Sequence, residues 1–402
     1  MSDPAARSSF RSDLRVIGLI GVAHFFSHFF QLALPPLFPL LKTVFGVPYV
    51  ALGLTVSVFY GASGIGQTLS GFLVDRVGAL RVLLGGMALF AASIALAGLV
   101  PTYWLLLPVA LLAGLGNSVF HPADYSILNA SVDARRIGRG YSVHSVSGNL
   151  GWAVAPTVVF ALTAHFGWRA ALVTVGGLGL IMAGVLATQA HLFASARGAG
   201  RSRGATDVRL LLSAPILAAF AYFALIAMAV IGVQTFGVSG LIRVYETPMA
   251  TATAALTAFL LGSAVGTLVG GLLADRTRRH DVLAVSGLVG GAVLMLVLAS
   301  GGVSLALLPG LLALAGFCQG ATGPSRDMLV RAATPTGASG RVFGFVYSGL
   351  DLGSCITPLV FGWLLDHGDP RMVFAVVGAL LLCTIATVVR VRRAAQPVPA
   401  GA

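Results

Sequence analysis

The sequence predicts an all-α polytopic membrane protein with twelve transmembrane helices in two parallel six-helix repeats. Charged residues make up only 9% of the 402 residues and hydrophobic residues 57%, whereas about a quarter of an ordinary soluble domain is charged. Apolar runs of about 20 residues, the length that crosses a bilayer, recur along nearly the whole chain. Similar residues also return at matching places in the two halves. These observations exclude a soluble fold.

Turn residues and charges divide the apolar runs into twelve spans. We expect them near residues 14–41, 48–74, 80–99, 103–130, 140–164, 169–191, 210–242, 250–274, 281–299, 303–330, 341–365 and 371–390. An even number of crossings places both termini on one side of the membrane. The first span follows a polar segment without a small-residue cleavage site, so we expect it to remain in the protein.

The basic residues predict which side that is. The net charge of +12 could indicate nucleic-acid binding, but the arginines lie in short clusters between apolar runs. With cytoplasmic termini, all but five of the 25 lysines and arginines fall in cytoplasmic segments. The exceptions are Lys42, Arg169, Arg243 and Arg371 in outer segments and Arg326 inside a span. The positive-inside rule therefore favours cytoplasmic termini, and we expect no nucleic-acid partner.

The tenth and eleventh spans repeat residues of the fourth and fifth. Gly114, Pro122, Arg139, Gly151 and Pro156 correspond to Gly316, Pro324, Arg341, Gly353 and Pro358. A basic, glycine-rich segment separates the two halves. We expect an N-terminal six-helix bundle at 1–195, a cytoplasmic linker at 196–209 and a C-terminal six-helix bundle at 210–402. Two such halves rocking about a central site are typical of secondary transporters.

A motif after the second span recurs after the eighth. GFLVDRVGALRVL at 71–83 matches GLLADRTRRHDVL at 271–283, and both resemble the loop motif of the major facilitator superfamily. The resemblance implies the major facilitator fold. A carboxylate at a helix end can pair with arginines or with helix N-termini when one side of a transporter is closed. We therefore expect gating roles for Asp75, Arg76, Asp275 and Arg276.

Three further stretches resemble the fosmidomycin-resistance type of exporter within that superfamily. They are HFFQLALPPLFPLLK at 28–42, GNSVFHPADYSIL at 116–128 and VSGNLGWAVAP at 146–156. The resemblance implies efflux of small, often anionic, solutes or drugs by proton antiport, in the bacterial cytoplasmic (inner) membrane. The partners would then be the substrate, protons and the lipid bilayer. We expect a monomer.

Polar side chains inside the first span lie on one face of its helix. His24, His28 and Gln31 are spaced at i, i+4 and i+7, and such a stripe does not face lipid without cost. We expect these three residues, together with Tyr60, to contact substrate. Alternatively, the histidines are neutral groups that hydrogen-bond to neighbouring helices. At the matching positions of the seventh span only Gln234 is polar, and it is a further expected substrate contact.

His121 and Asp124 form a second polar pair on one face of the fourth span. Pro122 between them removes a backbone hydrogen bond, which a membrane helix tolerates beside a cavity or another helix. A buried carboxylate beside a histidine can exchange a proton near neutral pH, so we expect both residues to take part in proton coupling. Alternatively, Asp124 pairs with an arginine of the following loop (Arg135, Arg136 or Arg139).

The tenth span carries the basic residue that lies outside the orienting clusters. Arg326 aligns with Asp124, and an unpaired arginine inside the membrane would cost several kcal/mol. It therefore either pairs with an aspartate (Asp327, Asp351 or Asp124) or binds an anionic substrate. We expect substrate binding by Arg326 and proton coupling by Asp327 and Asp351. Asn149 aligns with Asp351 and is a further expected substrate contact.

Other classes of protein have less support. The motifs HExxH, GxSxG and GxxxxGK[ST] are missing from the sequence, so we expect no catalytic residue and no cofactor. The alternatives are proton-coupled uptake of an organic acid and divalent-metal transport by N-terminal histidines. We expect no metal site, because only His24 and His28 are close in sequence and no cysteine joins them. His144 either caps the start of the fifth span or joins the site.

Overall fold

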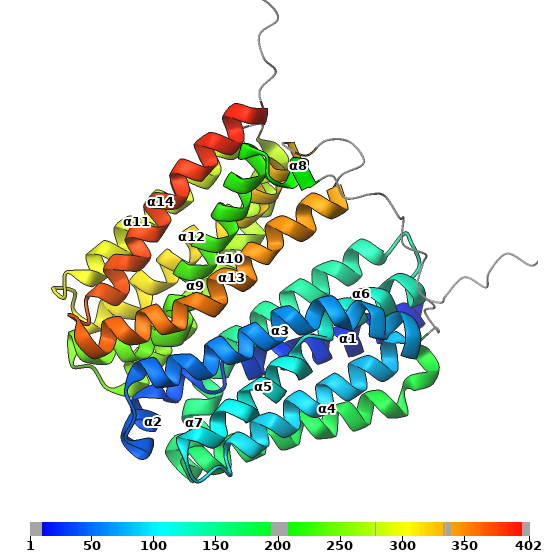
Figure 1. Cartoon of the computed structure of the whole chain (residues 1–402), viewed down its shortest axis with the longest axis horizontal. Helices are drawn as coiled ribbons and strands as arrows, with labels where there is room; N and C mark the ends of the chain where they lie inside the picture. The colour runs from blue at the N-terminus through cyan, green and yellow to red at the C-terminus, as the bar shows by residue number, and fades with distance from the viewer. Residues whose placement is uncertain (1–9, 194–207, 278, 333, 335–338, 396–402) are drawn as a thin grey trace, which may run out of the picture. The chain divides into compact units, whose positions relative to one another are not determined.

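The computed structural model confirms the all-helical architecture (Figure 1). We describe residues 10–193, 208–277, 279–332, 334 and 339–395. These ranges contain no strand, and eleven of their segments are long and apolar enough to cross a membrane. One segment, α7 (Ile137–Thr188), has 52 residues, about 78 Å of helix against a bilayer core of about 30 Å. Gly167 divides α7 into two helices with φ 81° and ψ 156°, which accounts for the twelfth crossing.

The helices of the first half follow the predicted spans with two interruptions. They are α1 (Phe10–Gln31), the 3-10 turn η1 (Pro35–Leu37), α2 (Phe38–Phe45), α3 (Tyr49–Val77), α4 (Ala79–Ala97), η2 (Tyr103–Leu105), α5 (Leu106–Asn117), α6 (Phe120–Ser131), α7 and η3 (Ala190–Leu192). The prolines of η1 separate α1 from α2 within the predicted first span. The predicted fourth span breaks at Ser118 and Val119, in the turn before Pro122, because proline cannot donate the helical hydrogen bond.

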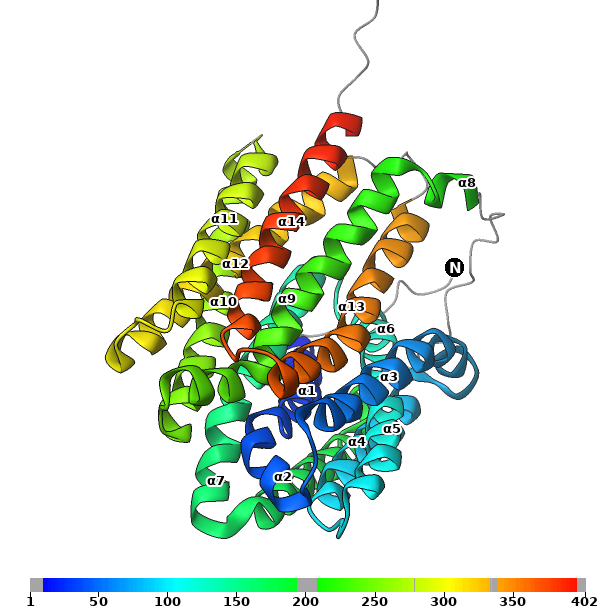
Figure 2. The ribbon, with the colours of Figure 1, turned by 60° about the vertical axis from the view of Figure 1, so that its left-hand side comes forward.

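The second half has the same order of long helices. They are α9 (Ala214–Tyr245), α10 (Met249–Arg276), α11 (His280–Ala299), α12 (Leu308–Ala332), α13 (Ser339–His367) and α14 (Met372–Ala395), with the short elements α8 (Val208–Leu211) and η4 (Leu305–Leu307). Within this half α9, α11, α12 and α14 pack side by side (Figure 2). Residues 194–207, which include most of the predicted linker, lie outside the described residues.

The chain forms two compact units. The first comprises Met1–Leu37 and Val58–Arg201, and the second comprises Phe38–Ser57 and Ser202–Ala402. Segment 38–57 thus groups with the second unit, although it lies within the first predicted bundle. Asp366 of α13 gives one reason, since its carboxylate accepts the backbone N–H groups of Tyr49 and Val50, each at 2.8 Å, at the start of α3. It thereby caps the N-terminus of that helix.

Glycines repeat the same close helix contacts in each unit. A Cβ atom on Gly114 would collide with the carbonyl oxygen of Phe59, and one on Gly316 would collide with that of Phe259. Because only a residue without a side chain lets two helix backbones approach so closely, glycine is required at both positions. The internal repeat seen in the sequence is therefore a repeat of packing contacts.

Candidate functional site

Helices α1, α6 and α7 of the first unit gather five titratable side chains, which we call the His–Asp cluster: His24, His28, His121, Asp124 and His144. Asp124 is fully buried. Its Oδ2 atom lies 3.0 Å from Nε2 of His144 and 3.3 Å from Nδ1 of His24. The partners of Asp124 are therefore histidines, and the alternative pairing with an arginine of the following loop is wrong.

The imidazole rings of the cluster are in direct contact. His24 stacks on His144 with 3.5 Å between ring centroids, and its centroid lies 4.4 Å from that of His28. His24 and His144 are each only 2% exposed, whereas His121 is an exposed residue 5.2 Å from His24 between centroids. The cluster is thus a buried core with one accessible member.

Gly148 on α7 makes room for two of these rings. A Cβ atom at this position would lie 2.9 Å from Nε2 of His24 and 2.9 Å from Cε1 of His28. One turn further along, a Cβ atom on Gly151 would collide with the carbonyl oxygen of Phe25. The small residues of the VSGNLGWAVAP stretch therefore bring α1 close enough to α7 for His24 to reach His144.

A polar network lies next to the cluster. Asn117 Oδ1 accepts hydrogen bonds from Ser27 (3.0 Å) and from Gln31 (3.1 Å), and its Nδ2 donates to Ser63 (2.8 Å). The indole N–H of Trp152 donates to Oε1 of Gln31 at 3.1 Å. Gln31, at the end of α1, is thus hydrogen-bonded to one residue of α5 and one of α7. The sequence analysis missed Asn117, and the only signal it offered was a polar residue at the end of an apolar run.

Arg326, on α12 of the second unit, occupies the position that corresponds in the repeat to Asp124 of the first unit. Its Nε donates to Oδ1 of Asp327 at 2.9 Å, so Arg326 pairs with one of the three predicted aspartates, and its binding of an anionic substrate stays a prediction. The guanidinium carbon lies 4.0 Å from the ring centroid of Phe223 and 6.0 Å from that of Tyr347. Among the described residues, its two terminal nitrogens have no hydrogen-bonding partner. Arg326 also lines a small, otherwise mostly apolar cavity together with Tyr222.

The remaining predicted site residues are more dispersed. Gln234 is buried in the second unit, and its Oε1 has no hydrogen-bonding partner among the described residues. Asn149, Tyr60 and Asp351 are half-buried on α7, α3 and α13. The structure does not join these four residues to the His–Asp cluster, and their roles stay predictions.

The residues predicted to act in gating lie at two matching helix ends. Asp75 and Arg76 end α3 and are exposed, as are Asp275 and Arg276 at the end of α10. In the described part of the chain Asp75 forms no ion pair, so its latch role also stays a prediction.

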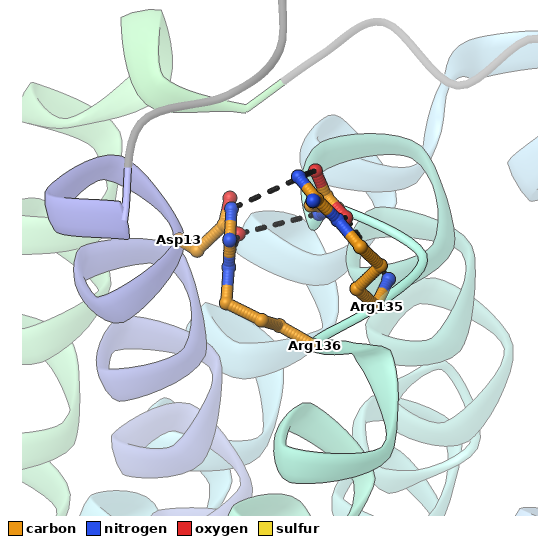
Figure 3. A network of polar contacts seen from close by, with 4 residues as sticks. Asp13, Arg135 and Arg136 are labelled. Carbon is orange, nitrogen blue, oxygen red and sulfur yellow. Dashed lines mark hydrogen bonds and ion pairs between the residues drawn. The ribbon is translucent and has the colours of Figure 1, made fainter.

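A charged network joins α1 to the loop between α6 and α7. Figure 3 shows Asp13 facing Arg135 and Arg136 of that loop. Nε of Arg136 lies 2.6 Å from Oδ2 of the buried Asp13, and the same oxygen accepts the backbone N–H of Asp133 at 3.3 Å. The hydrogen bond from Arg135 lowers the pKa of Asp133 to about 2. These arginines are therefore engaged at the end of the unit, away from Asp124.

Comparison with known proteins places this geometry in a family. The model of the Major Facilitator Superfamily matches residues 20–252 and 234–402. The chain is 24% identical over 395 residues to the fosmidomycin resistance protein of Escherichia coli (strain K12), covering 96% of this chain and 94% of that protein. It is 29% identical over 144 residues to a probable L-galactonate transporter of the same organism, covering 36% of this chain and 32% of that protein.

Solved structures agree on the fold. The crystal structure of a bacterial homologue of the human lysosomal transporter Spinster, in an inward-facing and occupied conformation, has a TM-score of 0.79 with this chain at 14% identity, covering 98% of this chain and 100% of that one. The predicted resemblance, the predicted fold and the expectation of a transporter rather than an enzyme are confirmed. This chain belongs to the Major Facilitator Superfamily of membrane transporters.

Proposed function

We propose that this protein exports small organic anions in exchange for protons by alternating access. The observation that carries the proton coupling is the buried Asp124 carboxylate, which shares one oxygen between His144 and His24. A lone carboxylate within the membrane would cost several kcal/mol. One proton on this group of residues gives an aspartate–imidazolium pair without net charge, whereas its loss leaves a buried negative charge.

Protonation of the His–Asp cluster would then bias the conformational state. A ligand shifts an equilibrium only by its differential affinity for the two states, and a proton is such a ligand. His121 is the accessible member through which the proton would enter and leave, with Asp124 as its buried acceptor. We propose that Asp327 and Asp351 contribute to the same coupling from the second unit.

The proposed anion site lies at Arg326. Its Nε is occupied by Asp327, but its terminal N–H groups form a fork that suits a carboxylate, phosphate or phosphonate. The name of one relative, the probable L-galactonate transporter, supports an anionic substrate, since galactonate is a carboxylate. We propose further substrate contacts at His24, His28, Gln31, Gln234, Tyr60 and Asn149.

The proposed setting follows from the distribution of charge. Arginine clusters between spans favour cytoplasmic termini. The bacterial relatives support the proposal of an inner membrane protein. The paired helix ends at Asp75–Arg76 and Asp275–Arg276 are the proposed gating elements on that side. We propose that the monomer is the functional unit, since one chain contains both repeats.

Transport in liposomes under an imposed pH gradient tests the proton coupling. Purified protein should move labelled fosmidomycin or L-galactonate faster when protons flow in the opposite direction. Asp124→Asn should retain substrate exchange without a gradient but lose this acceleration, because the amide cannot carry the proton. Asp369→Asn, in an exposed loop, is the matched control. An Asp124→Asn variant that still responds fully to the gradient would show that the coupling lies elsewhere.

Two further outcomes separate the alternatives. Substrate that accumulates in the direction of proton flow would identify an uptake symporter instead of an exporter. Arg326→Lys keeps the charge but loses the two-point fork, so it should weaken anion transport at least about tenfold, whereas the exposed Arg331→Lys should not. Full activity of Arg326→Lys, or a cationic substrate, would contradict the anion site.

A further inference from the structure

Three histidines of the first unit hold metal-ligand atoms near a common point. One ring nitrogen each from His24, His121 and His144 lie within 4.8 Å of one another. The three residues belong to α1, α6 and α7, so tertiary packing and not sequence proximity brings them together. The sequence analysis weighed divalent-metal transport by the N-terminal histidines as an alternative but expected no metal site, because spacing along the chain does not report which helices meet.

The spacing of these nitrogens is close to that of a zinc site. With zinc–nitrogen bonds of about 2.0–2.1 Å, the ligand atoms of a tetrahedral site lie roughly 3.4 Å apart. The rings therefore need to move together by about 1 Å. His121 is exposed and can make this adjustment by a side-chain rotation. His24 and His144 are stacked, so one of these two rings must also tilt for a nitrogen of each to point at the same ion.

Asp124 supplies the fourth donor. Its Oδ2 lies beside two of the three histidines, and its Oδ1 is buried without a hydrogen-bonding partner among the described residues. A buried polar atom without a partner costs free energy that a bound cation would recover. Three imidazoles and one carboxylate suit zinc and its neighbours, whereas magnesium and calcium prefer oxygen ligands throughout.

We propose that His24, His121, His144 and Asp124 form a binding site for one divalent transition-metal ion of the zinc class. Binding would occupy the groups that we assign to proton coupling, so metal and proton would compete; that consequence alone rests on the proposed function. The accessible His121 provides the entry path that a metal site needs.

The test uses full-length protein in detergent, purified through a tag without histidine. Co²⁺ is the spectroscopic probe, because tetrahedral Co²⁺ absorbs visible light much more strongly than the hydrated ion. We expect one equivalent of Co²⁺ per chain with a tetrahedral spectrum, displaced by Zn²⁺. His121→Ala, which changes an exposed side chain, should weaken binding at least about tenfold. His165→Ala, an exposed histidine outside the cluster, is the matched control and should bind as the wild type does.

Two results would overturn the metal site. One is the absence of a tetrahedral Co²⁺ spectrum at one equivalent, and the other is equal affinity in His121→Ala and His165→Ala. Asp124→Asn, which is nearly equal in volume, gives a second readout and should change the spectrum. Because binding is measured without substrate or a pH gradient, its failure is distinguishable from failure of the transport proposal.

Discussion

Gly148→Ala tests whether the close approach of α1 and α7 holds the His–Asp cluster together. The added methyl group would lie 2.9 Å from atoms of both His24 and His28, inside the contact distance of about 3.5 Å. Both rings are nearly buried and have little room to move. Overpacking of this kind costs about 1–3 kcal/mol. The variant should also lose the acceleration of transport by a pH gradient, because His24 is pushed from its 3.3 Å contact with Asp124.

Gly184→Ala, in the second of the two helices of α7, is the control for the methyl group itself. A Cβ atom there meets nothing within 4 Å, so the change should be neutral or stabilise the helix by up to about 1 kcal/mol. Because the helix-propensity gain is common to both variants, they should differ by about 1–3 kcal/mol in the free energy of unfolding, measured by denaturant titration in mixed micelles with circular dichroism. Equal unfolding curves, or normal proton-driven transport by Gly148→Ala, would refute the reasoning.

Three more predictions concern the ends of the helices. Asp366→Ala removes both acceptors from the start of α3 and should lower the unfolding free energy by about 1–2 kcal/mol; an unchanged melting curve would contradict the capping role. Arg136→Met takes the 2.6 Å partner from buried Asp13 and should cost on the order of 3 kcal/mol, and a double-mutant cycle with Asp13→Asn should recover a coupling energy well above zero. The depressed pKa of Asp133, about 2, means that its stabilising contribution is complete above its unfolded pKa of about 3.9 and is lost only as the pH falls toward 2. Stability of wild type and Asp133→Asn should therefore change in parallel between about pH 5 and 8, and divergence there would show that another group titrates.

The fold was predictable because the bilayer restricts the choices. Only helices satisfy the backbone within lipid, so an apolar run of sufficient length already specifies its structure. The boundary between the fifth and sixth spans coincides with Gly167, whose positive φ ends one helix and begins the next. The apolar pattern missed the interruptions inside spans, such as the break at Ser118 and Val119, because hydropathy does not report the missing N–H of Pro122 that causes this break.

The site was predictable only where its members share one helix. Helical spacing placed His24 beside His28 and His121 beside Asp124, since periodicity reports which residues occupy one face. It cannot report which faces of different helices meet. The sequence therefore favoured a helix cap for His144, although its Nε2 lies 3.0 Å from Oδ2 of Asp124.

The two units use one set of packing contacts to present different chemistry. Gly114 and Gly316 make equivalent contacts, yet the position of Asp124 in the first unit is occupied by Arg326 in the second. In the first unit a carboxylate lies among imidazoles, a setting that suits a proton, and in the second a guanidinium lies on an aromatic ring, a setting that suits an anion. A coupled transporter needs two ligands that bias one conformational equilibrium, and this bias is reciprocal between their sites. Under the proposed function, divergence at equivalent positions of a repeated scaffold would therefore supply two different sites without requiring two different folds.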